Sequence, residues 1–189
     1  MRPKASLRFY FLGLAVAALE EFITQGVLKQ NYAAWIVPTI IAFVPFLILV
    51  RCIGGLLDNN FAEARAVLIY YVAAGGIGLL FEWFVIGLTP WSNPSAPFLA
   101  MLIFQLGMFS FWGSVALAPR LLLDRRESVG RVRRWFVRAL ISGMAVIYVL
   151  AFTVPREIRF PATIAAVLFT FLALNISYHQ YLRALRTAG

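Results

Sequence analysis

Two adjacent carboxylates, Glu20 and Glu21, interrupt the apolar run LAVAALEEFITQGVLKQ, which begins at Leu14. A third carboxylate, Glu82, stands in the apolar run LLFEWFVIG with Trp83 beside it. Carboxylates in such surroundings can exchange a proton or bind a cation, and an adjacent indole can add a cation–π contact to a positively charged ligand. A charged side chain at the centre of a bilayer costs about 2.5–3.5 kcal/mol on insertion scales, so a glutamate at that depth indicates a function.

The composition decides whether these runs lie in a membrane. Of the 189 residues, 62% are hydrophobic and 13% are charged, and the mean hydropathy is +0.83. Soluble globular domains average about 45–50% apolar and about 25% charged residues. A chain this apolar has too few polar residues to cover a water-soluble fold. The sequence therefore predicts an integral membrane protein.

The apolar residues fall into six long runs. A membrane-spanning helix needs roughly 20 mostly apolar residues. Six runs meet this length, at residues 7–28, 34–53, 66–88, 97–117, 135–154 and 160–178. The connections between them are short and leave no room for a soluble domain. We predict an all-α polytopic membrane protein, in which residues 1–189 form one compact bundle of six transmembrane helices.

The basic residues predict the orientation of this bundle. With six spans, one side of the membrane holds both termini and the second and fourth connections, and it carries 14 of the 17 Lys and Arg. The other side carries Lys29, Arg156 and Arg159. The positive-inside rule then places both termini in the cytoplasm. We expect a multi-pass protein of a bacterial plasma membrane, and the net charge of +9 does not indicate a nucleic-acid partner because the basic residues line one membrane face.

The densest basic run is RRESVGRVRRWFVRAL. Within it Arg131, Arg134 and Arg138 recur at helical spacing, so they share one face of a helix. A basic helix at the membrane interface attracts anionic lipid headgroups. We predict lipid-headgroup contacts for these three arginines, with a plain topological anchor as the alternative.

The acids lie at one depth when helix geometry is applied. Along the predicted spans, with a rise of 1.5 Å per residue, Glu20 lies about 20 Å above the cytoplasmic end of the first span and Glu82 about 24 Å above that of the third. The fourth span runs the other way, so Gln105 lies about 12 Å below its outer end. All three are in the outer half of the bilayer. The predicted ligand-binding residues are Glu20, Glu21, Glu82, Trp83 and Gln105.

Other kinds of site lack the residues that they need. The chain has one cysteine, Cys52, and one histidine, His179. No cluster of the two has metal-ligand spacing, and no histidine lies within the membrane to act as a base. We therefore predict no catalytic residue, no metal site and no cofactor.

Three functions remain open. The leading hypothesis is binding or transport of a small cationic or amphipathic solute by the outer-half acids. The second is a non-catalytic subunit whose glutamates pair with basic residues of other membrane subunits. The third is a membrane-embedded enzyme acting on a lipid or isoprenoid, with Glu20 and Glu21 as acid and base, although neighbours on a helix point about 100° apart. For Glu21 a structural role is also open, as a hydrogen-bonded link through Gln25 towards Lys29.

Two likenesses accompany these alternatives. ALEEF resembles the Pro-x-Glu-Glu motif of heterodimeric lycopene cyclases at Glu20 and Glu21, with Ala18 in the place of the proline. That likeness implies an isoprenoid substrate. The predicted layout of six spans with cytoplasmic termini is similar to the substrate-binding subunits of energy-coupling-factor transporters, without a shared motif, and implies solute binding. We assign no family from either likeness.

Overall fold

The computed structural model of the chain describes residues 3–22, 26, 31, 35–87, 89 and 97–188, with the side chain of Glu20 outside the described part. Every regular element within these ranges is helical. In chain order they are α1 (Pro3–Glu21), α2 (Ile36–Pro38), η2 (Thr39–Phe43), α3 (Val44–Asn60), α4 (Glu63–Phe81), η3 (Glu82–Ile86), α5 (Phe98–Leu123), α6 (Glu127–Thr153) and α7 (Arg156–Ala188), where η marks a π-helical turn.

Four stretches of the described chain are long and apolar enough to cross a membrane. They are Thr39–Asn60, Glu63–Val85, Phe98–Leu123 and Glu127–Thr153, and α1 adds a shorter apolar stretch, Leu7–Leu19. Helices suit a bilayer because every backbone polar group is bonded within the segment. The chain is thus an all-helical membrane protein, and the count of six spans stays a prediction.

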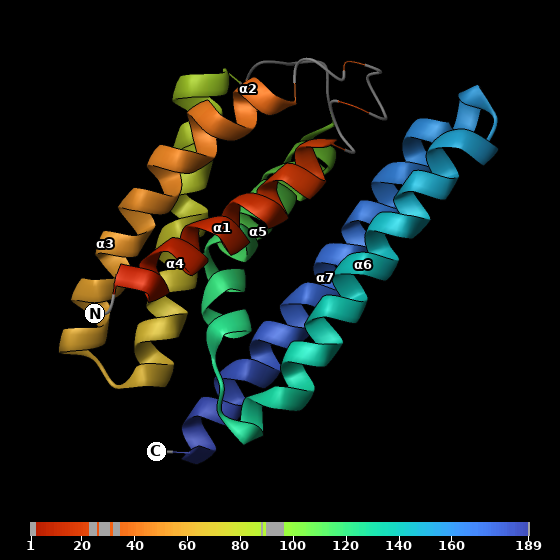
Figure 1. Ribbon diagram of the computed structural model, residues 1–189. Helices are drawn as coiled ribbons and strands as arrows, with labels where there is room; N and C mark the ends of the chain where they lie inside the picture. Colours follow the sequence, from red (N-terminus) through yellow and green to blue (C-terminus); the bar gives the residue numbers. More distant parts are fainter. Residues whose placement is uncertain are drawn as a thin grey trace.

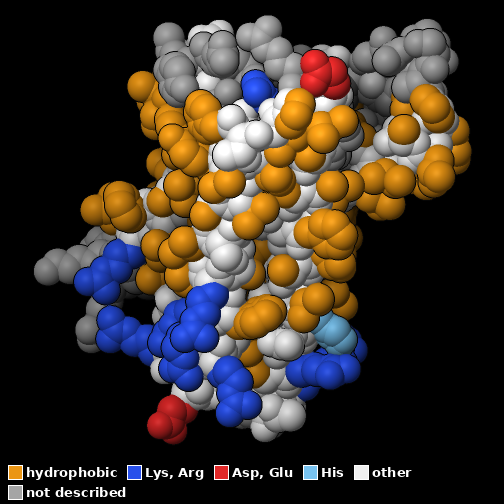
Figure 2. Space-filling model, turned by 90° about the vertical axis from the view of Figure 1, so that its right-hand side faces the viewer, with side chains coloured by type: hydrophobic (Ala, Val, Ile, Leu, Met, Phe, Trp, Pro, Cys, Tyr) orange, Lys and Arg blue, Asp and Glu red, His pale blue; other side chains and the backbone are white. Residues whose placement is uncertain are grey.

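The outside of the bundle is apolar. Phe11, Phe84, Phe98 and Phe169 are each more than 70% exposed. Exposed apolar surface on this scale marks contact with lipid or with another protein. On the face formed by α6 and α7, hydrophobic side chains fill the middle and basic side chains gather towards one end (Figure 2).

The helix boundaries follow local chemistry. Phe61 takes an extended conformation (φ −133°, ψ 152°) that ends α3, and Pro155 stands between α6 and α7. Gly87 has φ +82°, a left-handed conformation that glycine adopts without a Cβ penalty, and it ends η3. Several boundaries differ from the prediction. The second predicted span, 34–53, corresponds to Thr39–Asn60, and α5 and α7 continue six and ten residues beyond their predicted ends at 117 and 178. The largest difference at a helix start is in α6, which begins at Glu127, eight residues before the predicted span. The basic run is therefore the first turns of α6, an amphipathic extension that hydropathy alone does not recognise as part of the helix.

Helices α1, α3, α4 and α5 pack around one core, and α6 and α7 form a hairpin beside them (Figure 1). The hairpin joins the bundle through α7, where the Tyr71 hydroxyl donates to Asn175 Oδ1 at 2.6 Å and Asn175 donates to Ser110. Hydrogen bonds of this kind between helices contribute to association in lipid. The α3–α4 turn, the α5–α6 connection and the C-terminus lie at the same end of the molecule (Figure 1).

Candidate functional site

Glu82 lies at the junction of α4 and η3, and its side chain is buried. Only 4% of its surface is exposed, and the indole Nε1–H of Trp112 donates to its Oε1 at 3.0 Å. A buried carboxylate needs such a donor, because burial without one costs several kcal/mol. The contact between α4 and α5 thus encloses a carboxyl group, and the Trp112 indole fixes the orientation of that group.

Trp112 is fully buried among aromatic rings. Phe43 stacks on it with ring centroids 4.6 Å apart, and Phe46 meets it edge-on at 4.6 Å. Gly78, one turn before Glu82, makes room for it, since a Cβ there would stand 2.0 Å from Trp112 Cγ. The glycine therefore permits the close approach of α4 and α5 that brings the indole to Glu82.

Glu21, the last residue of α1, belongs to the same site. Its side chain is half-buried, and its Oε2 lies in the interior. Its charge lies within electrostatic range of Glu82. The structure thus places two of the predicted acids in the same part of the bundle, from helices that are 61 residues apart in sequence. The predicted role of Glu20 stays a prediction, because its side chain is not among those that the structure describes.

Trp83 and Gln105 form a second pair. The Trp83 indole donates to Gln105 Oε1 at 2.9 Å, and both side chains are half-buried. Because Trp83 follows Glu82 directly on a helical turn, it points to another face of the segment. The indole that touches Glu82 is that of Trp112, a residue that the sequence reasoning missed.

Two π-helical turns flank this layer. η3 begins at Glu82, and η2 (Thr39–Phe43) supplies Phe43 to the Trp112 stack. In η2, Thr39 is buried, and its hydroxyl donates to the Trp35 carbonyl at 2.6 Å. Single π turns within longer helices occur frequently at functional sites. Their position beside the buried acid favours a site here over simple packing.

Comparisons with models of protein families, with curated proteins and with solved structures find no match to this chain. Function is therefore inferred from its own geometry. Among the residues that the structure describes, no three His, Cys, Asp or Glu side chains cluster as metal ligands. The site instead consists of two carboxylates, an indole donor and surrounding phenylalanines.

The predicted headgroup residues Arg131, Arg134 and Arg138 lie exposed along the first half of α6. They form one stripe on the helix surface. Arg133, between them, donates to the Asp124 carbonyl at 2.6 Å. The stripe is therefore separate from the contacts that join α6 to the rest of the chain.

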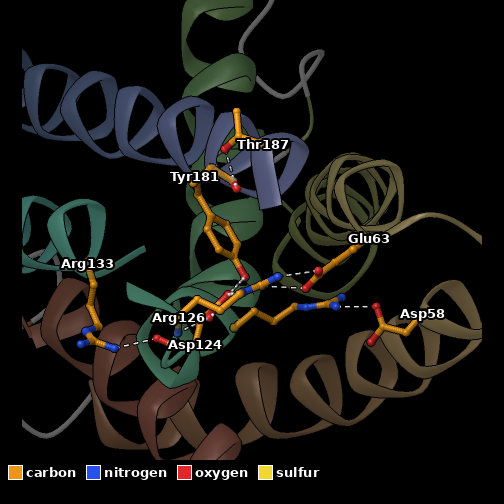
Figure 3. Close-up of polar contacts among 9 residues, drawn as sticks. Asp58, Glu63, Asp124, Arg126, Arg133, Tyr181 and Thr187 are labelled. Carbon is orange, nitrogen blue, oxygen red and sulfur yellow. Dashed lines mark hydrogen bonds and ion pairs between the residues drawn. The ribbon is translucent and has the colours of Figure 1, made fainter. Parts of the chain in front are cut away.

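An ion-pair network occupies the arginine-rich end (Figure 3). Arg126 bonds Glu63 at 2.6 and 2.7 Å and also pairs with Asp124. Tyr181 of α7 donates its hydroxyl to Asp124 at 3.0 Å. A further ion pair joins Asp58 of α3 to Arg120 of α5. These contacts connect the helices at the arginine-rich end.

Asp124, which lies between α5 and α6, makes this network sensitive to pH. Burial raises its pKa, but the bonds from the Arg126 side chain and backbone and from Tyr181 outweigh burial and hold the pKa below its usual value. A lowered pKa in the folded state stabilises the fold at neutral pH, and that contribution is lost as the pH falls through the lowered value.

We expect Asp124→Asn to lower stability by about 2 kcal/mol at pH 7, because hydrogen bonds to a charged group are lost. The deficit should shrink as the pH falls below the usual pKa of an aspartate, about 4, towards the lowered pKa of Asp124 in the folded state. Melting curves in detergent between pH 3 and 7 measure this. Glu127→Gln, which removes an exposed carboxylate from the next helical turn, is the control and should change stability by at most about 0.5 kcal/mol. A deficit that does not vary with pH would contradict the role given to the Asp124 charge.

Proposed function

We propose that the chain binds or transports a small cationic or amphipathic solute at the acidic and aromatic site formed by Glu82, Glu21 and Trp112. The observation that carries this proposal is the Glu82 carboxylate, 4% exposed and hydrogen-bonded to the Trp112 indole within a membrane helix. Such a group is costly to bury and indicates a function.

The partners of the acids favour a positively charged ligand. At the arginine-rich end, Asp58, Glu63 and Asp124 are all paired with arginines. Glu82 instead receives a neutral donor and has a second carboxylate nearby. A carboxylate in an apolar layer is stabilised by a proton or by a bound cation. The surrounding aromatic rings suit an organic cation better than a bare metal ion.

The location that we propose rests on the sequence expectation. We propose six spans in a bacterial plasma membrane, of which the first includes α1 and the last lies in α7. Both termini are then on the cytoplasmic side. The clustering of 14 of the 17 basic residues on one side supports this orientation. In it, Glu82 and Glu21 lie in the outer half of the bilayer and would meet solute arriving from outside.

Glu82→Gln tests the proposal because it keeps the shape and an acceptor for Trp112 but removes the charge. We expect at least one of sodium, choline and tetraphenylphosphonium to raise the melting temperature of the wild-type chain in detergent, and none to raise that of the variant. Binding at a hundredfold excess over Kd stabilises by about 2.7 kcal/mol. The apo variant should melt no lower than wild type, since the desolvation cost of the charge is removed with it.

Glu157→Gln is the matched control for this experiment. Glu157 is an exposed carboxylate in the first turn of α7, so its loss removes the same charge without touching the site. The control should keep the wild-type response to each cation. A Glu82→Gln chain that responds like wild type, or a wild-type chain that responds to none of the three, would refute cation binding at this site.

A further inference from the structure

A groove runs along the hairpin of α6 and α7. It has a volume of about 510 Å³ and is lined by both helices, from Trp135 and Arg138 at one end to Leu150 on α6, and by Ala162, Ala166 and Phe169 on α7. The groove lies on the side of the hairpin turned away from α4 and α5, which α7 contacts through Phe171 and Asn175. Its walls are therefore exposed to the lipid that surrounds the protein.

The interior of the groove is apolar in effect, because its hydroxyls are bonded to their own helices. Ser142 donates to the Arg138 carbonyl at 2.6 Å, and Thr170 donates to the Ala166 carbonyl at 2.8 Å. Gly143 sets the depth, since a Cβ there would stand 2.3 Å from Thr170 Oγ1. The glycine allows α6 and α7 to pack closely beneath the groove and leaves a hydrocarbon-lined channel above.

The groove is longer than the depth of one leaflet. From Trp135 to Leu150 the helix rises about 22 Å, whereas half of a hydrocarbon core of about 30 Å is about 15 Å. An acyl chain that enters at the Trp135 end therefore has an apolar wall along its whole depth. A helix of a second copy, about 10–12 Å across with its side chains, would rest on such a channel rather than in it, and it would extend over both leaflets.

Among the residues that line the groove, the basic side chain stands at one end. Arg138 lines the groove together with Trp135, and the same arginine lines a neighbouring hollow with Arg133 and Arg134. Arg131 continues the exposed stripe one turn further along α6. Basic pockets beside membrane helices bind anionic headgroups, and tryptophan favours the same interfacial depth. The apolar channel thus ends in a site complementary to a phosphate.

We propose that this groove binds one anionic phospholipid of the leaflet on the arginine-rich side. An acyl chain lies between α6 and α7, and the phosphate contacts Arg134 and Arg138. The site is separate from Glu82 and does not depend on the solute proposed above. It gives the predicted headgroup contacts a defined place on the molecule and adds a binding channel for the lipid tail.

Native mass spectrometry of the purified chain tests the proposal, with phosphatidylglycerol and phosphatidylcholine of equal chain length as probes. We expect wild type to bind one phosphatidylglycerol more tightly than any phosphatidylcholine. Arg134→Gln combined with Arg138→Gln should weaken that binding roughly 20- to 30-fold, because each basic residue near a membrane surface contributes about a fivefold attraction. Arg125→Gln combined with Arg183→Gln removes the same charge from exposed positions outside the groove and should leave the binding unchanged.

Ala162→Leu combined with Ala166→Leu fills the channel and should remove the tight lipid while leaving the arginines in place. Ala100→Leu adds a similar side chain to an exposed position on α5 and should have no effect. Equal binding of the two lipids by wild type would overturn the proposal. An equal loss in both arginine pairs would also overturn it, as would a dimer of the chain that dissociates when the channel is filled.

Discussion

Replacing Gly78 with alanine is expected to lower the melting temperature of the chain by roughly 6–12 °C, the shift that a loss of about 3 kcal/mol produces in a protein of this size. The new Cβ would stand 2.0 Å from Cγ and 2.1 Å from Cβ of Trp112. Because Trp112 is fully buried and its Cβ is fixed to the α5 backbone, the ring cannot rotate out of the way. Relief requires α4 and α5 to move apart, which also breaks the bond between Trp112 and Glu82.

Two other glycines of α4 are matched controls. A Cβ at Gly76 would have nothing within 4 Å, so Gly76→Ala should stabilise the helix by about 1 kcal/mol through helix propensity alone. A Cβ at Gly75 would meet the ring of Phe109 at 2.7 Å, and that ring is half-buried, so it can shift more easily than the fully buried Trp112. The melting temperature of Gly75→Ala should therefore lie between those of Gly78→Ala and Gly76→Ala. If the melting temperature of Gly78→Ala is as high as that of Gly76→Ala, α4 does not pack against Trp112 as closely as the structure describes.

The helical character of this chain is predictable because it depends on local sequence. The apolar runs predicted each of the four long apolar helices, since lipid requires long apolar helices and hydropathy measures that property directly. The ends of these helices are less predictable and differ from the predicted bounds by up to eight residues. In α6 the first eight residues, 127–134, carry four charged side chains beside Val129 and Val132, and hydropathy gives little signal for such a segment.

The contacts of the candidate site are not predictable from the sequence. Rise per residue predicts that the acids of the first and third spans lie at one level, and the structure places Glu21 within electrostatic range of Glu82. The rotation of each helix decides which partner each side chain meets, and a single sequence does not give it. Trp83 is adjacent to Glu82 in sequence but bonds Gln105, whereas Trp112, 30 residues away, reaches the carboxylate.

The second large loss of stability is expected when Trp112 is replaced with phenylalanine. Phenylalanine at this position keeps most of the aromatic packing with Phe43 and Phe46 but removes the indole donor. Glu82 would then remain buried without the hydrogen bond that the structure gives it. Losing a hydrogen bond to a charged group costs about 1.5–3 kcal/mol, and the lost ring volume adds a cavity term. We expect Trp112→Phe to unfold at a clearly lower temperature than wild type in detergent.

A double-mutant cycle separates the hydrogen bond from the packing. In a Glu82→Gln chain, the acceptor for Trp112 is neutral, and such a bond contributes only about 0.5–1.5 kcal/mol. The cavity term is the same in both backgrounds and cancels. Trp112→Phe should therefore cost about 1 kcal/mol less in the Glu82→Gln chain than in wild type. Equal costs would mean that Trp112 contributes packing alone, and the buried acid would then lack the indole support on which the proposed cation site depends. A smaller cost in the Glu82→Gln chain would show that Trp112 holds a charged carboxylate inside the bundle, the arrangement that a bound cation requires.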